Sequence, residues 1–266
     1  MSHSCMEVKA LCMRRGRREI LANINMRLDI GEVLGVLGPN GAGKSSFLAA
    51  CSAELPIRVG DVMLGGVSAH DQSPLSLART RAVLSQQTSM TFDLPVTEVI
   101  AMGAYPFPEA SPATVQSWID EAIALTDLGD KASQPYHALS GGEQQRVQFA
   151  RVLVQTRGIV SVQGQAFLFL DEPTASLDPR HQVQLMQIVR ELATTSSIAV
   201  LIVLHDLNMA ARWCDRLMLM VHGEVAAISH PKDVLNEDLL ERVYGLPLFV
   251  RPHPIHPDRL IVMADG

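Results

Sequence analysis

The sequence predicts an α/β fold with a mostly parallel sheet, a small antiparallel β subdomain and an inserted helical subdomain. Two segments, 167–170 and 198–204, are apolar throughout, as expected of parallel strands that helices cover on both faces. A third apolar segment, 33–37, runs directly into a glycine-rich loop and an apolar helix. Between residues 88 and 134, four prolines separate two patterns of helical period, which predicts a helical insert.

The length and composition are those of one globular domain. The chain has 266 residues, 47% of them hydrophobic, and a net charge of −6, which argues against a nucleic-acid partner. Its longest apolar run is far shorter than the ~20 residues that span a bilayer. No basic and apolar leader follows Met1, so we expect no export. The cysteines form no Cys-x-x-Cys pair, which predicts reduced thiols at Cys5, Cys12, Cys51 and Cys214.

The N-terminal part predicts the small antiparallel sheet. Its strands are expected at 7–11 and 24–28, joined through the basic segment 14–18. This segment is either a solvated turn or a surface that faces a nucleotide, because it precedes the glycine-rich loop. Short strands are also expected at 61–64 and 81–84.

The glycine-rich loop reads Gly-x-x-x-x-Gly-Lys-Ser, the pattern of the phosphate-binding loop of P-loop NTPases. Glycines let backbone N–H groups curl around a phosphate, and the helix that follows adds its positive N-terminal end. Lys44 would reach the β- and γ-phosphates of a bound triphosphate, and Ser45 would offer an oxygen to Mg²⁺. The alternative is a plain turn between strand and helix. The predicted ATP-binding residues of the loop are Gly38, Pro39, Asn40, Gly41, Ala42, Gly43, Lys44, Ser45 and Ser46.

Two adjacent carboxylates, Asp171 and Glu172, follow the apolar segment 167–170, at the strand end where ligands of open α/β sheets bind. Asp171 would hold Mg²⁺ through its shell, and Glu172 would take the proton from an attacking water. The alternative is an acid-rich helix start. His205 ends the next apolar segment, beside the cap residue Asp206, where a phosphate or water contact is favoured over a structural role.

Ser140 and Glu143 have the spacing of a capping box at the start of a helix expected to run to residue 154. A cap alone has no need of both Gly141 and Gly142. The pair therefore favours a second place where backbone N–H groups meet a phosphate. A polar loop is expected to end at 163–166.

The remaining segments predict further helices, strands and turns. The insert is expected to hold helices at 97–103 and 112–128, and apolar residues of 88–107 belong either to its core or to a docking surface. His253 and His256 alternate with prolines, and a stiff surface loop is favoured there over a metal or haem site. The other expected elements are a turn at 176–178, a helix at 181–194, a hairpin of 217–221 and 225–228, one helix at 231–244, and strands at 246–250 and 260–263.

Taken in order, these motifs resemble those of the ATP-binding subunit of ATP-binding-cassette (ABC) transporters, over essentially the whole chain. The motifs are the loop 38–45, the signature 139–143, the strand with its carboxylates 167–172, the turn 176–178 and His205. The resemblance implies a head-to-tail homodimer in which each ATP lies between the phosphate loop of one chain and the signature of the other. It implies that the trans signature residues are Ser140, Gly141, Gly142 and Glu143, the catalytic residues Glu172, His205 and Gln86, and the metal ligands Ser45, Gln86 and Asp171.

The same resemblance implies the domain layout and the partners. Residues 1–266 form one ABC ATPase domain, with a nucleotide-binding core and β subdomain at 1–87 and 152–266 and a helical subdomain at 88–151 that carries the signature. ATP binding closes the dimer and hydrolysis reopens it, which drives two transmembrane permease subunits docked on the helical subdomains. A periplasmic substrate-binding protein is an indirect partner. The expected location is peripheral, on the cytoplasmic face of the bacterial inner membrane.

Two positions depart from the family pattern. Glu143 replaces the common glutamine, and Arg15 replaces the aromatic residue that stacks on adenine, although a guanidinium plane can also stack.

Within the family, segment 81–106 is similar to importers of iron chelates, haem and vitamin B12. The polar insert before Phe167 and the tail after 243–245 are similar to the haem branch. Haem import is therefore expected, with ferric siderophore or vitamin B12 as alternative cargoes. Two alternative functions belong to a different class, a soluble cassette ATPase and a P-loop kinase. A P-loop kinase would not account for the signature residues.

Overall fold

The computed structural model describes residues 5–86, 94–257 and 259–264. The chain forms two compact units, the first made of Met1–Asp71 with Ala199–Gly266 and the second of Gln72–Ile198. No helix in the described residues is long and apolar enough to cross a membrane.

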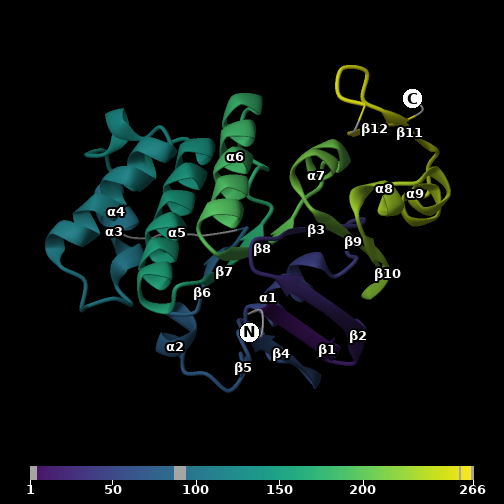
Figure 1. Ribbon diagram of the computed structural model, residues 1–266, viewed down its shortest axis with the longest axis horizontal. Helices are drawn as coiled ribbons and strands as arrows, with labels where there is room; N and C mark the ends of the chain where they lie inside the picture. Colours follow the sequence, from purple (N-terminus) through teal and green to yellow (C-terminus); the bar gives the residue numbers. More distant parts are fainter. Residues whose placement is uncertain (1–4, 87–93, 258, 265–266) are drawn as a thin grey trace. The chain divides into compact units, whose positions relative to one another are not determined.

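The first unit contains the predicted antiparallel sheet, with strands in the order β2-β1-β4-β5 (Figure 1). The strands β1 and β2 are longer than predicted, and only Gly16 and Arg17 separate them. Gly16 lies at φ +63°, a conformation that glycine adopts without strain, so the basic segment becomes strand ends with a tight turn. The bounds are Cys5–Arg15 for β1, Arg18–Asp29 for β2, Val59–Leu64 for β4 and Val67–Ser68 for β5.

The first unit also contains the parallel strands on which the glycine-rich loop depends. The strand β3 (Val33–Leu37) is buried at every residue and pairs in parallel with β8 (Ile198–Val203) and β9 (Arg216–Val221). The strand β10 (Glu224–Ser229) pairs antiparallel with β9, which confirms the predicted hairpin. The helices of this unit are α1 (Lys44–Cys51), α7 (Leu207–Trp213), α8 (Pro231–Val234) and α9 (Glu237–Tyr244).

The single helix predicted at 231–244 is wrong. It is broken at Leu235 and Asn236, because the Asn236 side chain accepts the Leu239 N–H at 2.9 Å and so begins a new helix. After α9, the chain forms an antiparallel hairpin of β11 (Leu248–Pro252) and β12 (Leu260–Ala264), where two tail strands were predicted.

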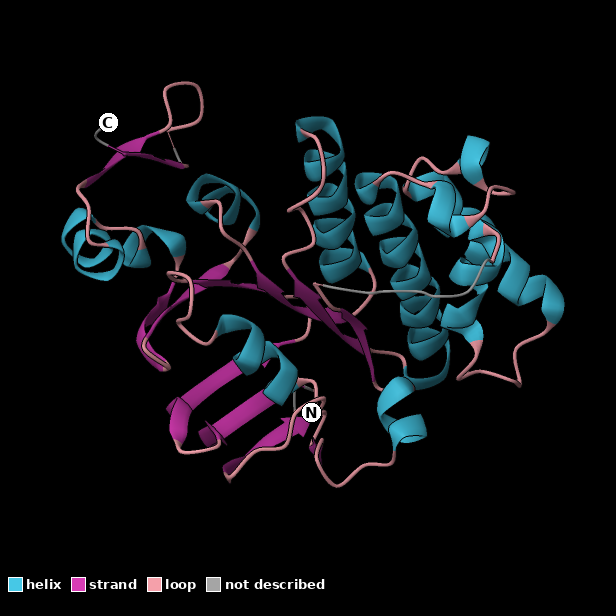
Figure 2. Ribbon diagram, turned by 180° about the vertical axis from the view of Figure 1, so that it is seen from behind, coloured by secondary structure: helices cyan, strands magenta, loops and turns pink. Residues whose placement is uncertain are grey.

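The second unit combines two parallel strands with most of the long helices, drawn in cyan in Figure 2. The strands are β6 (Arg81–Leu84) and β7 (Ala166–Asp171), and all six residues of β7 are buried. The predicted helical character of the insert is confirmed, while α2 was not predicted. The helices are α2 (Pro74–Ala78), α3 (Val96–Ala101), α4 (Pro112–Leu125), α5 (Gly141–Gln163) and α6 (Pro179–Thr195).

The helix α5 runs nine residues beyond the predicted end at Val154, because its buried face continues through Thr156, Gly158 and Ile159. The ring of Phe107 packs on Gly158 so closely that a Cβ there would lie 2.3 Å from the ring. The helix ends at Gly164, which takes the left-handed conformation of a C-cap. The predicted polar loop before Phe167 is therefore mostly helix.

Candidate nucleotide-binding site

The predicted phosphate loop joins β3 to α1 in the first unit, as its sequence indicates. Gly41 and Gly43 have φ values of +80° and +100°, which a side chain would strain. The helix α1 begins at Lys44, so the backbone N–H groups of its first turn face the end of the loop. This is the geometry of an anion site at a helix N-terminus.

Lys44 lies against this loop. Its side chain is 5% exposed, and Nζ donates hydrogen bonds to the carbonyl oxygens of Gly38 at 2.8 Å and Pro39 at 3.1 Å. The ammonium group is therefore held at the loop, where it can meet a phosphate without a large movement of the stem.

Two other parts of the first unit buttress the loop. A Cβ added at Gly38 would lie 2.2 Å from the Met220 carbonyl oxygen, so β9 supports the loop from one side. At the hairpin turn after β9, Gly223 donates its N–H to the Ala42 carbonyl oxygen at 3.0 Å. The loop therefore has little room to shift.

Tyr244, the last residue of α9, also contacts the loop. The sequence does not predict this contact. Burial of the Tyr244 phenol, opposed in part by a hydrogen bond from the Gly38 backbone N–H, raises its pKa to about 12. About two hundred residues separate Gly38 from Tyr244 in the sequence. No local pattern signals a contact of this kind.

In the second unit, the carboxylates lie at the end of β7 as predicted. Asp171 is its last residue and is 7% exposed, while Glu172 is partly exposed and has φ +48°. The Gln86 side chain donates from Nε2 to Glu172 Oε2 at 2.7 Å. Gln86 follows β6, which is paired with β7, so the sheet brings two predicted site residues together. The hydrogen bond orients the carboxylate, which a general base requires.

The predicted capping box at Ser140 is confirmed. Ser140 Oγ accepts the Glu143 N–H, and Glu143 Oε2 accepts the Ser140 N–H at 2.8 Å. A Cβ at Gly142 would lie 2.8 Å from the carbonyl oxygen of Ser176, whereas one at Gly141 would meet no atom of the described residues within 4 Å. Packing among the residues that the structure describes therefore explains Gly142 but not Gly141.

The charge of Glu143 makes a testable contribution to stability. Hydrogen bonds from the Ser140 side chain and backbone, with Lys131 nearby, lower the pKa of Glu143 to about 2. Because the folded pKa lies below the unfolded value of 4.5, the stabilisation is present above pH 4.5 and is lost as pH falls toward 2.

We therefore expect Glu143→Gln to lower the urea midpoint of unfolding by a constant amount from pH 8 to about 5. The difference from wild type should then shrink steadily below pH 4.5. Urea titrations at pH 7, 5, 4 and 3 test this. A difference that is undiminished at pH 3 would show that the loss comes from packing and not from the carboxylate charge.

His205 and Arg15 also belong to the first unit. His205 is exposed on the short connection between β8 and α7, and Asp206 caps α7 as predicted. Arg15 is the exposed last residue of β1, paired with Arg18. Asn40 is exposed, and Ser45 and Ser46 are partly buried in the first turn of α1.

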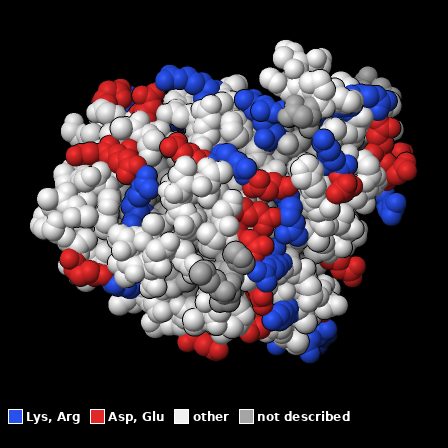
Figure 3. Space-filling model, in the orientation of Figure 1, with Lys and Arg blue, Asp and Glu red and all other residues white. Residues whose placement is uncertain are grey.

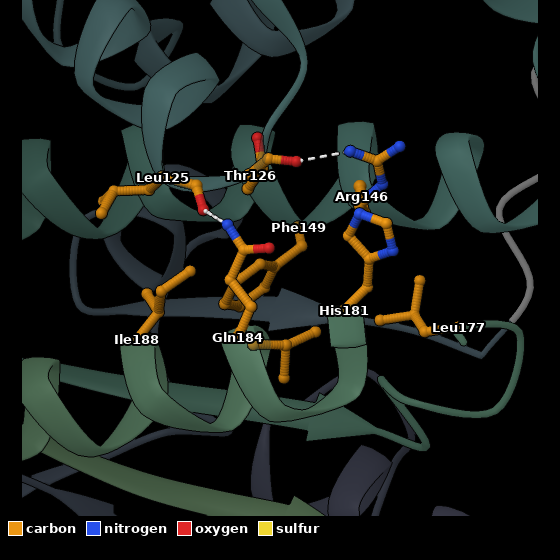
Figure 4. A pocket seen from close by; sticks show the side chains of 9 residues that line it. Leu125, Thr126, Arg146, Phe149, Leu177, His181, Gln184 and Ile188 are labelled. Carbon is orange, nitrogen blue, oxygen red and sulfur yellow. Dashed lines mark hydrogen bonds between the residues drawn. The ribbon is translucent and has the colours of Figure 1, made fainter. Parts of the chain in front are cut away.

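A small hollow also lies between α4, α5 and α6 of the second unit, and none of its lining residues is a predicted site residue (Figure 4). His181 lines it, and its Nδ1 lies 2.7 Å from Asp178 Oδ2, on the turn 176–178. Arg146, also lining it, donates to the Thr126 carbonyl oxygen at 2.7 Å, which ties α5 to the end of α4. The hollow thus lies beside the predicted turn.

Charges are mixed on the face drawn in Figure 3, where blue Lys and Arg side chains lie among red Asp and Glu side chains. Ion pairs of the second unit include Arg79–Glu109 and Arg157–Glu121. Among the described residues, no cluster of three or more His, Cys, Asp or Glu side chains could hold a metal ion. The predicted metal ligands are a hydroxyl, an amide and one carboxylate, a different kind of set.

Comparison with known proteins finds relatives that agree with one another in family. A family model described as ABC transporter matches residues 21–175. The chain is 46% identical over 259 residues to the hemin import ATP-binding protein HmuV of Bordetella pertussis, which covers 97% of this chain and 99% of that protein. It is 42% identical over 257 residues to the protein of the same name from Pseudomonas aeruginosa, again covering 97% and 99%.

Solved structures agree in fold. A metal-chelate type ABC transporter in an inward-facing conformation matches with a TM-score of 0.80 at 20% identity, over 100% of this chain and 98% of that chain. A dimeric ATP-binding cassette bound to ADP and Pi, in a post-hydrolysis state, matches with a TM-score of 0.74 at 24% identity, over 85% of this chain and 98% of that chain. These matches confirm the predicted fold class.

Proposed function

The chain belongs to the ABC transporter family, as one of its ATPases, and we propose that it powers the import of haem through a membrane permease. The observation that carries this proposal is the 46% identity to a hemin import ATP-binding protein, which extends over 97% of the chain and so includes the loop, signature, carboxylate and tail segments. Ferric siderophore and vitamin B12 are the alternative cargoes.

The working unit is a head-to-tail homodimer with two ATP sites. Each ATP binds the loop residues 38–46 of one chain and the signature, Ser140 to Glu143, of the partner subunit. The capped start of α5 supports this assignment, because its N-terminal N–H groups favour an anion. So does Gly141, since no contact among the described residues requires a glycine there.

Within each site, the chain's own residues bind, orient and move a proton. Lys44 neutralises the β- and γ-phosphates, and Arg15 stacks on the adenine. Glu172 accepts the proton of the attacking water, and its 2.7 Å hydrogen bond from Gln86 holds the carboxylate in one orientation. His205 contacts the γ-phosphate or that water. These roles extend the predicted site to its chemistry.

The donor set suits magnesium. Ser45, Gln86 and Asp171 supply a hydroxyl, an amide carbonyl and a carboxylate, the hard oxygens that Mg²⁺ prefers. Since Gln86 uses Nε2 to bond Glu172, its carbonyl oxygen is the end of the amide suited to a cation. When bound, Mg²⁺ would neutralise the charge that develops on the phosphate oxygens.

The permease docks on the helical subdomain, residues 88–151, and chiefly on 88–107, of which 88–93 lie outside the described residues. The support is Tyr105, which is 73% exposed on a segment that the buried Phe107 anchors to α5. An exposed aromatic side chain on a fixed segment is typical of a protein interface. The subunit is then peripheral on the cytoplasmic face of the bacterial inner membrane, and a periplasmic binding protein delivers the cargo from the other side.

Reconstitution tests the proposal. The subunit is co-purified with its membrane permease, placed in liposomes, and assayed for ATPase activity with a binding protein loaded with haem, ferric siderophore or vitamin B12. We expect only the haem-loaded protein to stimulate turnover. Stimulation by one of the other two would reassign the cargo, and failure to associate with any permease would favour a soluble ATPase.

Substitution of the docking residue makes the assay specific. Tyr105→Glu should keep basal ATPase but abolish stimulation, because an unpaired carboxylate would be desolvated at the interface. Ile255→Glu, at a residue that is 76% exposed in the C-terminal loop, is the matched control and should be stimulated normally. A loss of basal activity in Tyr105→Glu would place Tyr105 in the fold rather than the interface.

A further inference from the structure

The hairpin of β11 and β12 is held by side chains along its edges. Asn208 donates from Nδ2 to the Val262 carbonyl oxygen at 3.0 Å and accepts the Val262 N–H at Oδ1, at 2.6 Å. Its amide thus pairs with β12 as another strand would. On the facing strand, Val250, the register partner of Val262, donates its N–H to Glu237 Oε1 at 2.9 Å. The outward-facing N–H groups of both residues of this pair are therefore satisfied.

Asn208 lies in the first turn of α7, three residues after His205. The helix α7 has seven residues, too few to be stable by itself, so contacts outside the helix must fix it. Its start is fixed by Asp206, whose side chain accepts the N–H groups of Asn208 at 2.8 Å and Met209 at 3.0 Å. The bonds to Val262 tie the same turn to the C-terminal strand.

His205 lies on the connection between this turn and β8. It is two residues past the end of β8 and two residues before α7. On the strand side, Leu204 donates its N–H to the Val36 carbonyl oxygen of β3 at 3.1 Å, which fixes that end. A shift of the first turn of α7 would therefore move His205 while the strand stays in place.

We propose that Asn208 is a positioning residue for ATP hydrolysis: by pairing with Val262 it uses the C-terminal hairpin to hold the first turn of α7, and with it His205, in place. This inference rests on the role proposed above for His205. It assigns the C-terminal hairpin a function in the hydrolytic step of its own chain.

The test compares two asparagines that make the same kinds of bond. Asn208→Ala loses one donated and one accepted hydrogen bond. Asn236→Ala also loses one of each, to Asp233 and from Leu239, but at the start of α9. The purified full-length subunit is assayed for kcat, for KM, and for the Kd of a fluorescent ATP analogue. His205→Ala is measured in parallel.

We expect Asn208→Ala to lower kcat roughly 10-fold with Kd changed less than about twofold, because a displacement of about 1 Å near reacting groups costs up to ~10²-fold in rate. Amide exchange at Val262 should quicken in the same variant. Asn208→Asp keeps the accepting oxygen, so its kcat should lie between those of wild type and Asn208→Ala. Asn236→Ala should lose thermal stability with kcat near that of wild type.

The possible outcomes distinguish the positioning role of Asn208 from the role of His205 in hydrolysis. If His205→Ala lowers kcat while Asn208→Ala resembles Asn236→Ala, the positioning role of Asn208 is overturned and the role of His205 stands. If His205→Ala turns over ATP normally, the role of His205 in the proposed function fails, and the positioning role fails with it. If kcat and nucleotide affinity of Asn208→Ala fall together, Asn208 is only a structural residue.

Discussion

Replacing Glu172 with glutamine should lower ATP turnover by roughly 10²–10⁴-fold while ATP binding is kept. Glutamine has nearly the same shape as glutamate and can still meet Gln86, which bonds Glu172 at 2.7 Å, but it cannot accept the proton of water. Because closure then no longer leads to hydrolysis, the variant should accumulate as an ATP-bound dimer. Turnover assays, nucleotide binding and size-exclusion chromatography with ATP measure the three effects.

Glu121→Gln is the control for this experiment. Glu121 pairs with Arg157 on the same unit and has no role in the proposed site, so its loss should leave turnover near the wild-type value. If Glu172→Gln also keeps near-normal turnover, the general base lies elsewhere in the chain.

The second large effect concerns the shared ATP sites. Lys44→Ala removes the contact with the phosphates, and Ser140→Arg blocks the ATP bound by the partner subunit, so each variant alone should be nearly inactive. A mixture of the two forms heterodimers in which one composite site is intact and the other carries both changes. Nucleotide occlusion should therefore reappear at about one site per heterodimer.

Ser111→Arg controls for the loss of a helix cap, because Ser111 caps α4 as Ser140 caps α5. By itself, this variant should occlude nucleotide at both sites. Differently tagged subunits show whether heterodimers form. Heterodimers that form but occlude no nucleotide would contradict the head-to-tail arrangement. Restored turnover is a weaker expectation, because hydrolysis can require both sites.

The sequence predicted those features of the structure that local patterns determine. The fully apolar segment at 167–170 predicted a strand buried on both faces, because only such a strand lacks polar alternation. The Ser140–Glu143 spacing predicted a capping box that both hydrogen bonds confirm. Glycines 38, 41 and 43 predicted a loop whose backbone can curl around a phosphate, and all three have positive φ values in the structure.

The features that were missed depend either on contacts between distant residues or on a close balance between two local structures. Asn208 and Val262 are 54 residues apart, and no periodicity reveals that a side-chain amide will pair with a strand edge. The break in 231–244 depends on a choice by Asn236 between continuing one helix and capping another, a balance of about 1 kcal/mol. The catalytic roles themselves remain proposals, since residue types at one strand end define what chemistry is available and not whether it occurs.

The backbone at Glu172 has a consequence for how this protein can evolve. A residue with a side chain at φ +48° carries about 1–2 kcal/mol of conformational strain, which glutamine would inherit and glycine would relieve. A laboratory selection for heat resistance that did not demand turnover would therefore weigh this relief in Glu172→Gly against the lost hydrogen bond from Gln86 and the extra chain entropy of glycine, and would not retain Glu172 for its chemistry. Selection for transport opposes that change at the same codon. At Glu172, the residue proposed as the general base, the demands of stability and of activity are therefore in conflict.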